Sequence, residues 1–305
     1  MFIRVLGSAA GGGFPQWNCN CANCHGVRAG TIRARYRSQS SIAVSVDANY
    51  WVICNASPDI HQQIAAHTAL QPRVGVRDSA IAAVLLVDGQ IDHALGLLLL
   101  REHRQPLAVW TTDPVREDLS SGLPILTVLE SYCGIRWNRI ATDGSEFTIP
   151  ALPGVRLAAL PVEGKPGPYS PHRESPRSGD NIALIFRDQA TDHQAFYAPG
   201  LGAITPAVRQ AMRSSDVVLV DGTFWSDDEM IRVGVSTKRA RDIGHLPQNG
   251  SGGMAEELSQ LPRSMRRILI HINNTNPILD EASAERAQLA AAGIEVAFDG
   301  MEISL

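Results

Sequence analysis

Three cysteines stand within six residues near the start of the chain, at Cys19, Cys21 and Cys24. Thiolates this close converge on one soft metal ion more readily than they pair with each other, because a disulfide requires a narrow range of Cβ separations. We therefore predict a structural zinc site. A tetrahedral zinc needs a fourth ligand, which is either His25 or a residue that the fold brings close; the spacing leaves both open.

A second set of potential ligands follows an apolar stretch, 82–87, that is typical of a buried strand. Asp88, Gln90, Asp92 and His93 occupy the turn after it, and a helical pattern comes next. Open α/β sheets expose their ligand-binding residues at the carboxyl ends of strands. The turn is therefore a candidate site, although Asp92 and His93 are also ordinary helix-capping residues.

The other cysteines, the apolar segments and the net charge limit which classes of protein are possible. Cys54 and Cys133 stand far apart and the five cysteines are odd in number, which argues against a disulfide framework and predicts a reducing compartment. No continuous apolar segment of a signal peptide opens the chain, and the longest aliphatic run, 95–100, is too short to span a bilayer. We expect a cytoplasmic protein without membrane insertion. A net charge of -4 and a pI near 6.1 give no general attraction to nucleic acid.

Strand-like and helix-like segments alternate along all 305 residues, without a repeat or a linker. They predict one domain, 1–305, with two sheets between outer helices. The stretch 164–180, rich in Pro, Gly, Ser and Arg, is expected to be a long binding loop. Strands are predicted at 2–6, 41–46, 50–54, 82–87, 107–110, 155–160, 181–186, 195–198, 217–220 and 267–271, and helices at 57–67, 93–101, 114–119, 204–213, 254–261 and 280–292.

Several motifs together resemble one known family. They are the cysteine cluster after a glycine-rich start, Gln90 to His93, Val162 to Lys165, Val220 to Phe224, Gly244 to Pro247 and Ile270 to Pro277. In combination they are similar to the pyrroloquinoline quinone (PQQ) biosynthesis protein B family of the metallo-β-lactamase superfamily, over essentially the whole chain. The resemblance implies an α/β fold, the four-layer αββα sandwich.

The chain departs from the hydrolases of this superfamily. Their pattern has histidines where Asp88 and Gln90 stand, another histidine near Gly164, and a bridging carboxylate near 199–201. Without these ligands a pair of ions is not held close enough to act on one substrate. Dinuclear hydrolysis by zinc is therefore disfavoured.

The ligands that remain are Asp92, His93 and His271, with Asp88 in reserve. Two imidazoles and one carboxylate match the ligand set of mononuclear non-haem Fe(II) oxygenases. A zinc ion or an empty site are the alternatives. In related phosphodiesterases the fourth zinc ligand comes from near the last histidine, so His271 is alternatively a ligand of the structural zinc.

The resemblance implies a place in PQQ biosynthesis and, in it, an iron-dependent hydroxylation of the tyrosine ring of a glutamyl-tyrosine intermediate. O2 and the PQQ precursor are the expected partners, with other PQQ-pathway proteins and a homodimer as further candidates. The alternative is a non-catalytic carrier that helps to move PQQ or its precursor to the periplasm.

Such an intermediate carries carboxylates, so cationic side chains should line its pocket. Lys165 and Arg37 are the candidates, with Gln90 as a further substrate-binding residue; Arg101 is more typical of surface charge. His245 is a candidate general base or substrate-orienting residue. Asp221 is expected to hold a ligand histidine in one tautomer, with a plain turn cap as the alternative.

Overall fold

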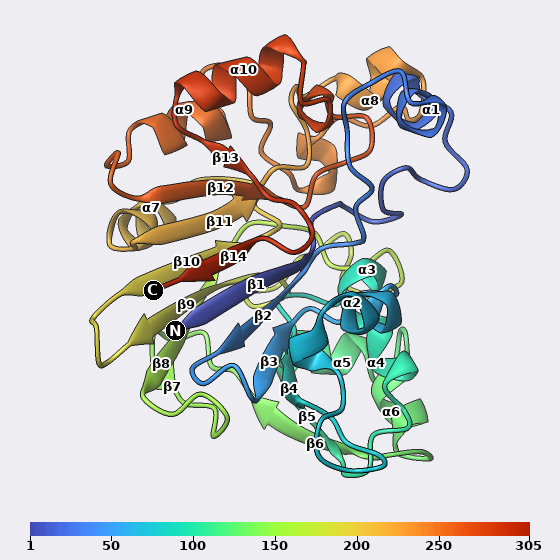
Figure 1. The fold of residues 1–305 in the computed structure, drawn as a ribbon, viewed down its shortest axis with the longest axis vertical. Helices are drawn as coiled ribbons and strands as arrows, with labels where there is room; N and C mark the ends of the chain where they lie inside the picture. Colours follow the sequence, from blue (N-terminus) through green and yellow to red (C-terminus); the bar gives the residue numbers. More distant parts are fainter.

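Two seven-stranded sheets form the centre of the computed structural model, which describes residues 1–305 (Figure 1). The first sheet has, in order, β14 (Glu302–Ser304), β1 (Phe2–Gly7), β2 (Ser41–Ser45), β3 (Trp51–Cys54), β4 (Ile81–Leu85), β5 (Leu107–Thr111) and β6 (Ile135–Arg139). The second has β13 (Glu295–Val296), β12 (Arg266–Ile270), β11 (Val217–Asp221), β10 (Gln194–Ala198), β9 (Ile182–Asp188), β8 (Val155–Pro161) and β7 (Glu146–Phe147).

The two sheets share a core of 29 buried residues. Alternate side chains of each strand point toward it, as in β8, where buried Val155 and Leu157 alternate with exposed Arg156. Side chains from the first sheet, such as Ile3, meet side chains from the second, such as Phe186. Burial of these apolar faces between the sheets is the main source of stability in such a sandwich.

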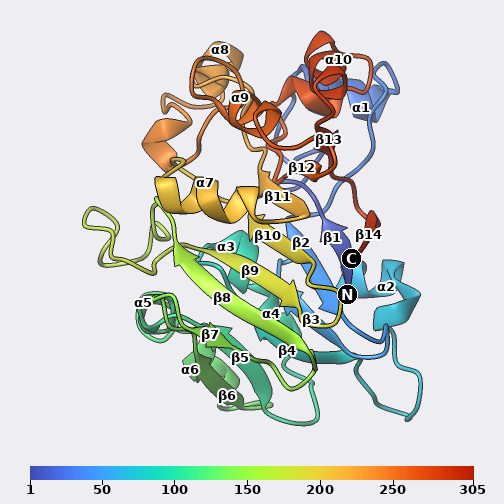
Figure 2. The same cartoon turned by 90° about the vertical axis from the view of Figure 1, so that its left-hand side faces the viewer.

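Helices cover the outer face of each sheet (Figure 2). A second apolar cluster joins the first sheet to its helices and a third joins the second sheet to its own, which gives four layers and confirms the αββα prediction. The helices on the first sheet are α2 (Ile60–Ala66), α3 (Ile91–Ala94), α4 (Gly96–Leu99), α5 (Asp113–Asp118) and α6 (Ile125–Leu129); those of the second half of the chain are α7 (Pro206–Arg213), α8 (Glu229–Val233), α9 (Met254–Ser259) and α10 (Ala284–Ala291), and α1 (Ala22–Ala29) lies in the cysteine segment. None of them combines the length and the apolar character needed to cross a lipid bilayer.

The predicted helix 93–101 is wrong in its bounds, because it consists of two single turns, α3 and α4, that meet at Leu95. Gly96 lies so close to the backbone of Ala56 and Ser57 that any larger side chain would collide with it. The sequence also failed to indicate several short elements, namely β6, β7, β13, β14, α1, α6 and α8. Most of them have fewer than six residues, too few for a hydrophobic period to be recognised.

Parallel strands in both sheets bring the chemically interesting turns to one edge. The strands β3 to β6 run parallel to one another, and so do the strands β10 to β13. The segment 86–93 follows β4, the segment 222–224 follows β11, and His271 follows β12 directly. An isolated bridge between Asp88 and Asn181 links the loops of the two sheets at this edge.

Candidate metal sites and active-site cavity

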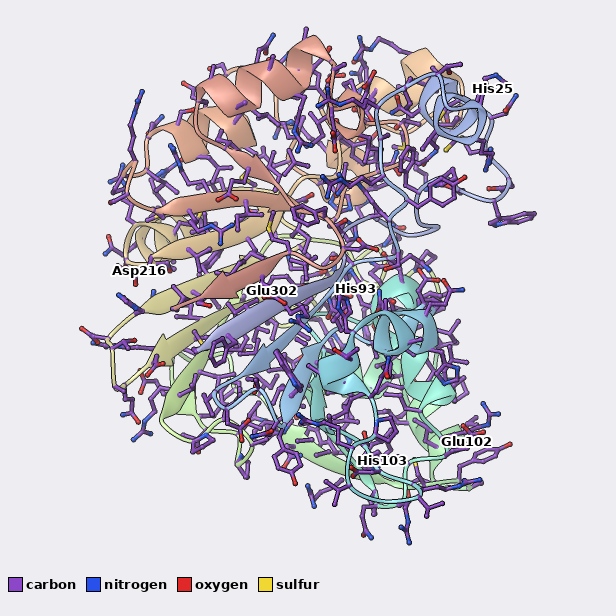
Figure 3. The ribbon with its side chains drawn as sticks, viewed as in Figure 1. His25, His93, Glu102, His103, Asp216 and Glu302 are labelled. Atoms are coloured by element: carbon purple, nitrogen blue, oxygen red, sulfur yellow. The ribbon has the colours of Figure 1, made fainter.

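A cavity of about 350 Å³ lies at this shared edge. Figure 3 shows His93 in the middle of the molecule, where the two halves meet. Asp92, His93, His245, His271 and Thr223 all line the cavity. Residues up to 179 positions apart in the chain thus contribute to one site.

His93 is held from behind and is free toward the cavity. Its Nδ1 atom lies 2.8 and 2.9 Å from the two carboxylate oxygens of Asp88, so Nδ1 carries a hydrogen, and in the neutral ring Nε2 carries the lone pair. Nε2 is buried and has no hydrogen-bond partner. Burial alone lowers the pKa of His93, but the carboxylates of Asp88 and Asp92 outweigh it and raise the pKa to about 9.

His271 presents a second ligand atom to the same point. Thr223 Oγ1 lies 2.9 Å from its Nδ1, and its Nε2 lies 3.2 Å from Asp92 Oδ2. The backbone of His271 has a φ of 62°, a left-handed conformation that a side-chain-bearing residue adopts only when its surroundings hold it there. The turn after β12 is therefore shaped to aim this ring.

Asp92, His93 and His271 form a group whose ligand atoms all lie within 4.8 Å of one another. Burial works against the charge of the Asp92 carboxylate, but His93 and His271 outweigh it and lower its pKa. An unpartnered imidazole nitrogen facing a second nitrogen and a carboxylate oxygen is what a cation would satisfy. The donor set therefore fits a divalent metal ion.

Asp88 has a different place from the one expected of a reserve ligand. Its Oδ1 accepts hydrogen bonds from the backbone N–H of Gln90 and from His93, and it is not part of the three-residue group. With both oxygens against the far side of the imidazole, Asp88 is placed to orient His93 rather than to bind an ion itself.

His245 and Asp221, which the sequence singled out separately, contact each other, so Asp221 holds His245 and not one of the two candidate ligand histidines. His245 Nδ1 lies 2.6 Å from Asp221 Oδ2, and its ring stacks on that of His271 with the centroids 5.5 Å apart. Burial lowers the pKa of His245, but Asp221 outweighs it, and the net direction is upward. The contact leaves Nε2 of His245 as the atom available to a bound molecule.

Asp221, His245 and His271 make a second group of possible ligands. Asp221, however, already accepts four hydrogen bonds, from the N–H groups of Leu201 and Thr223, from Thr223 Oγ1 and from His245. A carboxylate has about four acceptor sites, so none remains for an ion. This agrees with the expectation that a two-metal hydrolase is disfavoured.

The sulfur atoms of Cys19, Cys21 and Cys24 also lie within 4.8 Å of one another. Cys21 is the N-cap of α1, and its Sγ accepts a hydrogen bond from the backbone N–H of Cys24, which folds the cluster into one turn. The side-chain amide of Asn274 faces all three thiols, with Nδ2 at 3.0, 3.7 and 3.4 Å from the sulfurs of Cys19, Cys21 and Cys24. The three thiols therefore form a pre-assembled site for a soft cation.

Neither histidine considered for the fourth position joins this cluster. His25 is exposed on α1 (Figure 3), and His271 belongs to the cavity. Asn274 was not expected from the sequence as an individual residue, although it lies in the stretch 270–277 that carried the family resemblance.

Of the candidate substrate-binding residues, some line the cavity and others do not. Gln90 and Lys165 line the cavity, and the Gln90 amide donates to the backbone oxygen of Lys165 at 2.9 Å. Arg37 does not line it: its guanidinium is buried elsewhere, where it donates to Ser8 Oγ and the backbone oxygen of Ala297. Arg37 therefore connects the segment 35–38 to the C-terminal segment that contains Ala297. Arg101 forms an ion pair with Glu102 at the surface.

Comparison with known proteins identifies the same family that the sequence motifs resemble. Residues 50–272 match the β-lactamase superfamily domain. Coenzyme PQQ synthesis protein B of Azoarcus sp. (strain BH72) is 59% identical over the full length of both chains, and that of Cupriavidus necator is 57% identical over 99% of each. A crystal structure of Zn²⁺-bound PqqB from Methylobacterium extorquens is 37% identical, covers both chains completely and has a TM-score of 0.90.

More distant structures share the fold alone. A diphosphatase of the PhnP family is 16% identical with a TM-score of 0.67. The full-length identity to curated relatives, together with the match to the superfamily domain, shows that this chain belongs to the coenzyme PQQ synthesis protein B family within the β-lactamase superfamily.

Proposed function

We propose that this chain acts in PQQ biosynthesis as a non-haem iron hydroxylase of the tyrosine ring of a glutamyl-tyrosine intermediate. Family membership supports the pathway. The observation that carries the chemistry is the buried, unpartnered Nε2 of His93 beside Asp92 and His271. Two histidines and one carboxylate with room beside them are typical of iron oxygenases.

Asp92, His93 and His271 would hold the ion, and Asp88 and Thr223 would keep the two histidines in the tautomer that offers Nε2. The chemistry that iron would supply here is the reduction of O2. The carboxylates of Asp88 and Asp92 and three histidines line the cavity, so the protein's own part is to bind, to orient and to transfer protons.

His245 is the base of the proposal. With Nδ1 bonded to Asp221, its Nε2 can accept the proton of the substrate phenol, which makes the ring more electron-rich and more easily oxidised. Phe224 packs edge-on against His245, with the centroids 5.8 Å apart, and gives this end of the cavity an apolar wall for an aromatic ring.

The second metal of the proposal is a structural zinc held by Cys19, Cys21 and Cys24, with Asn274 in the fourth position. Turning the Asn274 amide over would bring its oxygen, a ligand atom, to the place where Nδ2 now faces the sulfurs. Asn274 is three residues after His271, so the zinc would brace the turn that aims this histidine.

Anaerobic reconstitution with Fe(II), followed by exposure to O2, glutamyl-tyrosine and a two-electron reductant such as ascorbate, tests the proposal; the reductant supplies the electrons that convert the second oxygen atom of O2 to water. We expect O2 consumption and a product heavier by oxygen, both lost in His93→Ala and kept in His61→Ala, which changes an exposed histidine on α2. Unchanged substrate, together with tight PQQ binding, would instead support the carrier role and reject the hydroxylase.

A further inference from the structure

Three cationic side chains line the same cavity as the candidate metal ligands, namely Lys165, Arg173 and Lys238. Lys165 and Arg173 are half-buried in the long loop 164–180, whereas Lys238 is exposed on the segment after α8. None of the three forms an ion pair. Other cations on the loop 164–180 and on the segment after α8 do form ion pairs. This end of the cavity therefore carries positive charge that the protein itself does not neutralise.

The paired cations on these loops make the contrast clear. Arg177, on the long loop, forms ion pairs with Glu117 and Asp180, and Arg239, next to Lys238, forms one with Asp227. None of these paired residues lines the cavity. On each loop the outward arginine has a carboxylate partner and the cation at the cavity has none. Cations that line a cavity without carboxylate partners attract an anion that binds there.

The two loops are held in a fixed relation. Gly244 adopts a φ of +88°, and a Cβ there would lie 3.1 Å from the backbone nitrogen of Lys165, so the loop after α8 packs directly on the long loop. Gln90 binds the backbone oxygen of Lys165, and the Arg173 guanidinium donates to the backbone oxygen of Pro166. That bond uses one of the five donors of Arg173 and leaves the others for a ligand.

We propose that Lys165, Arg173 and Lys238 form a recognition site for a substrate with at least two carboxylates, whose aromatic ring lies at the Phe224 end of the cavity. Arg173 suits a bidentate contact with one carboxylate, and the two lysines on separate loops suit a second. This inference rests on the proposed function for the identity of the ring, but it concerns binding alone and holds or fails without the oxidation.

The test uses zinc-loaded protein, in which no oxidation occurs, and two probes: the dipeptide glutamyl-tyrosine and its dimethyl ester, which lacks both negative charges. Titration calorimetry at low and high salt measures the affinity. We expect the ester to bind at least about 10-fold more weakly, and salt to weaken only the diacid. Equal binding of both probes, or binding of neither, would overturn the proposal.

Substitution of single cations tests which of them contribute to the binding of the carboxylates. Arg173→Gln and Lys238→Gln should each lower the affinity for the dipeptide by about 3- to 10-fold and leave the affinity for the ester unchanged. Arg173→Lys should have an intermediate affinity for the dipeptide. Arg239→Gln, a neighbouring cation that is paired outside the cavity, is the matched control and should change neither probe. Lys238 is exposed, so its substitution keeps the test valid even if Arg173→Gln impairs folding.

The two proposals fail separately. Charge-dependent binding without oxygen incorporation rejects the hydroxylase and supports the recognition site. Hydroxylation with affinities that are the same in Arg173→Gln, Lys238→Gln and the unmodified protein rejects the recognition site alone.

Discussion

Each of the three histidines at the cavity is held through its Nδ1 atom, by Asp88, Thr223 and Asp221 for His93, His271 and His245 respectively. A neutral imidazole bonded in this way offers the lone pair of Nε2 on its other side. The residue facing each Nδ1 sets the tautomer, so the same local arrangement would let His93 and His271 serve as the proposed metal ligands and His245 as the proposed base.

The residue scale gives a prediction for Asp88. Asp88→Ala removes the group that orients His93 without removing any metal ligand, so the affinity for the cavity metal should fall by about 10- to 100-fold. Titration with Co²⁺, after the cysteine site has been filled with zinc, measures this affinity by absorption. Asp47→Ala, in a surface turn, is the control and should bind normally. An unaltered affinity in Asp88→Ala would mean that His93 is oriented by something else.

At the scale of elements, α8 is tied to the segment that joins the two metal sites. Glu229, in the first turn of α8, accepts from the backbone N–H of Trp225 at 2.7 Å and lies 2.5 Å from Thr275 Oγ1. The Asn273 amide donates to the same Thr275 oxygen. One buried carboxyl group thus connects a short helix with residues between His271 and the cysteine site.

This carboxyl group should make stability depend on pH. Burial raises the pKa of Glu229 to about 7 from the 4.5 of an unperturbed glutamate. The folded state then holds the proton more tightly than the unfolded state, so stability falls as pH rises from about 4.5 to 7 and is constant above that range. Glu229→Gln, which imitates the protonated form, should remove this loss, which is about 2 kcal/mol between pH 5 and pH 8.

Urea unfolding of both proteins at these two pH values measures the difference. Glu285→Gln, in the first turn of α10, is the control for removal of an acidic side chain that is not buried. If Glu229→Gln follows the same pH dependence as the unmodified protein, the carboxyl group is ionised at no cost in the folded state.

At the scale of the whole molecule, the cysteine site connects the beginning of the chain with its last third. The Sγ atoms of Cys19, Cys21 and Cys24 lie beside Asn274, about 250 residues away in the sequence, and Asn23 donates to the backbone oxygens of Asn274 and Asn276. A metal ion held by these thiolates would therefore join two distant segments, and its binding energy would contribute to the stability of the fold.

Removal of this metal should destabilise the whole protein. We expect a chelator, or the substitution Cys24→Ser, to lower the thermal unfolding midpoint by at least about 5 °C, with loss of zinc measured by elemental analysis. Cys133→Ser, which changes a half-buried cysteine outside the cluster, is the control and should keep its zinc. Zinc loss without a change in the midpoint would show that the cluster does not brace the fold.

The sequence by itself determined the features that depend on near neighbours. The cysteine cluster, the Asp92–His93 turn after a buried strand and most of the longer strands were predictable, because close spacing and hydrophobic period constrain local geometry directly. The motifs also indicated the family and, with it, the αββα layers, which the comparisons confirm.

Only the tertiary structure decided which distant residues meet. It placed His271 beside Asp92 and not at the cysteine cluster, placed Asn274 against the thiols, put Arg37 in a buried contact away from the cavity, and added Arg173 and Lys238 to the cavity wall. These outcomes depend on strand order and on the packing of two sheets, which bring together residues whose local sequences carry no sign of each other. The type of a side chain determines which groups it is able to bind, whereas the tertiary packing of the backbone determines which group lies next to it.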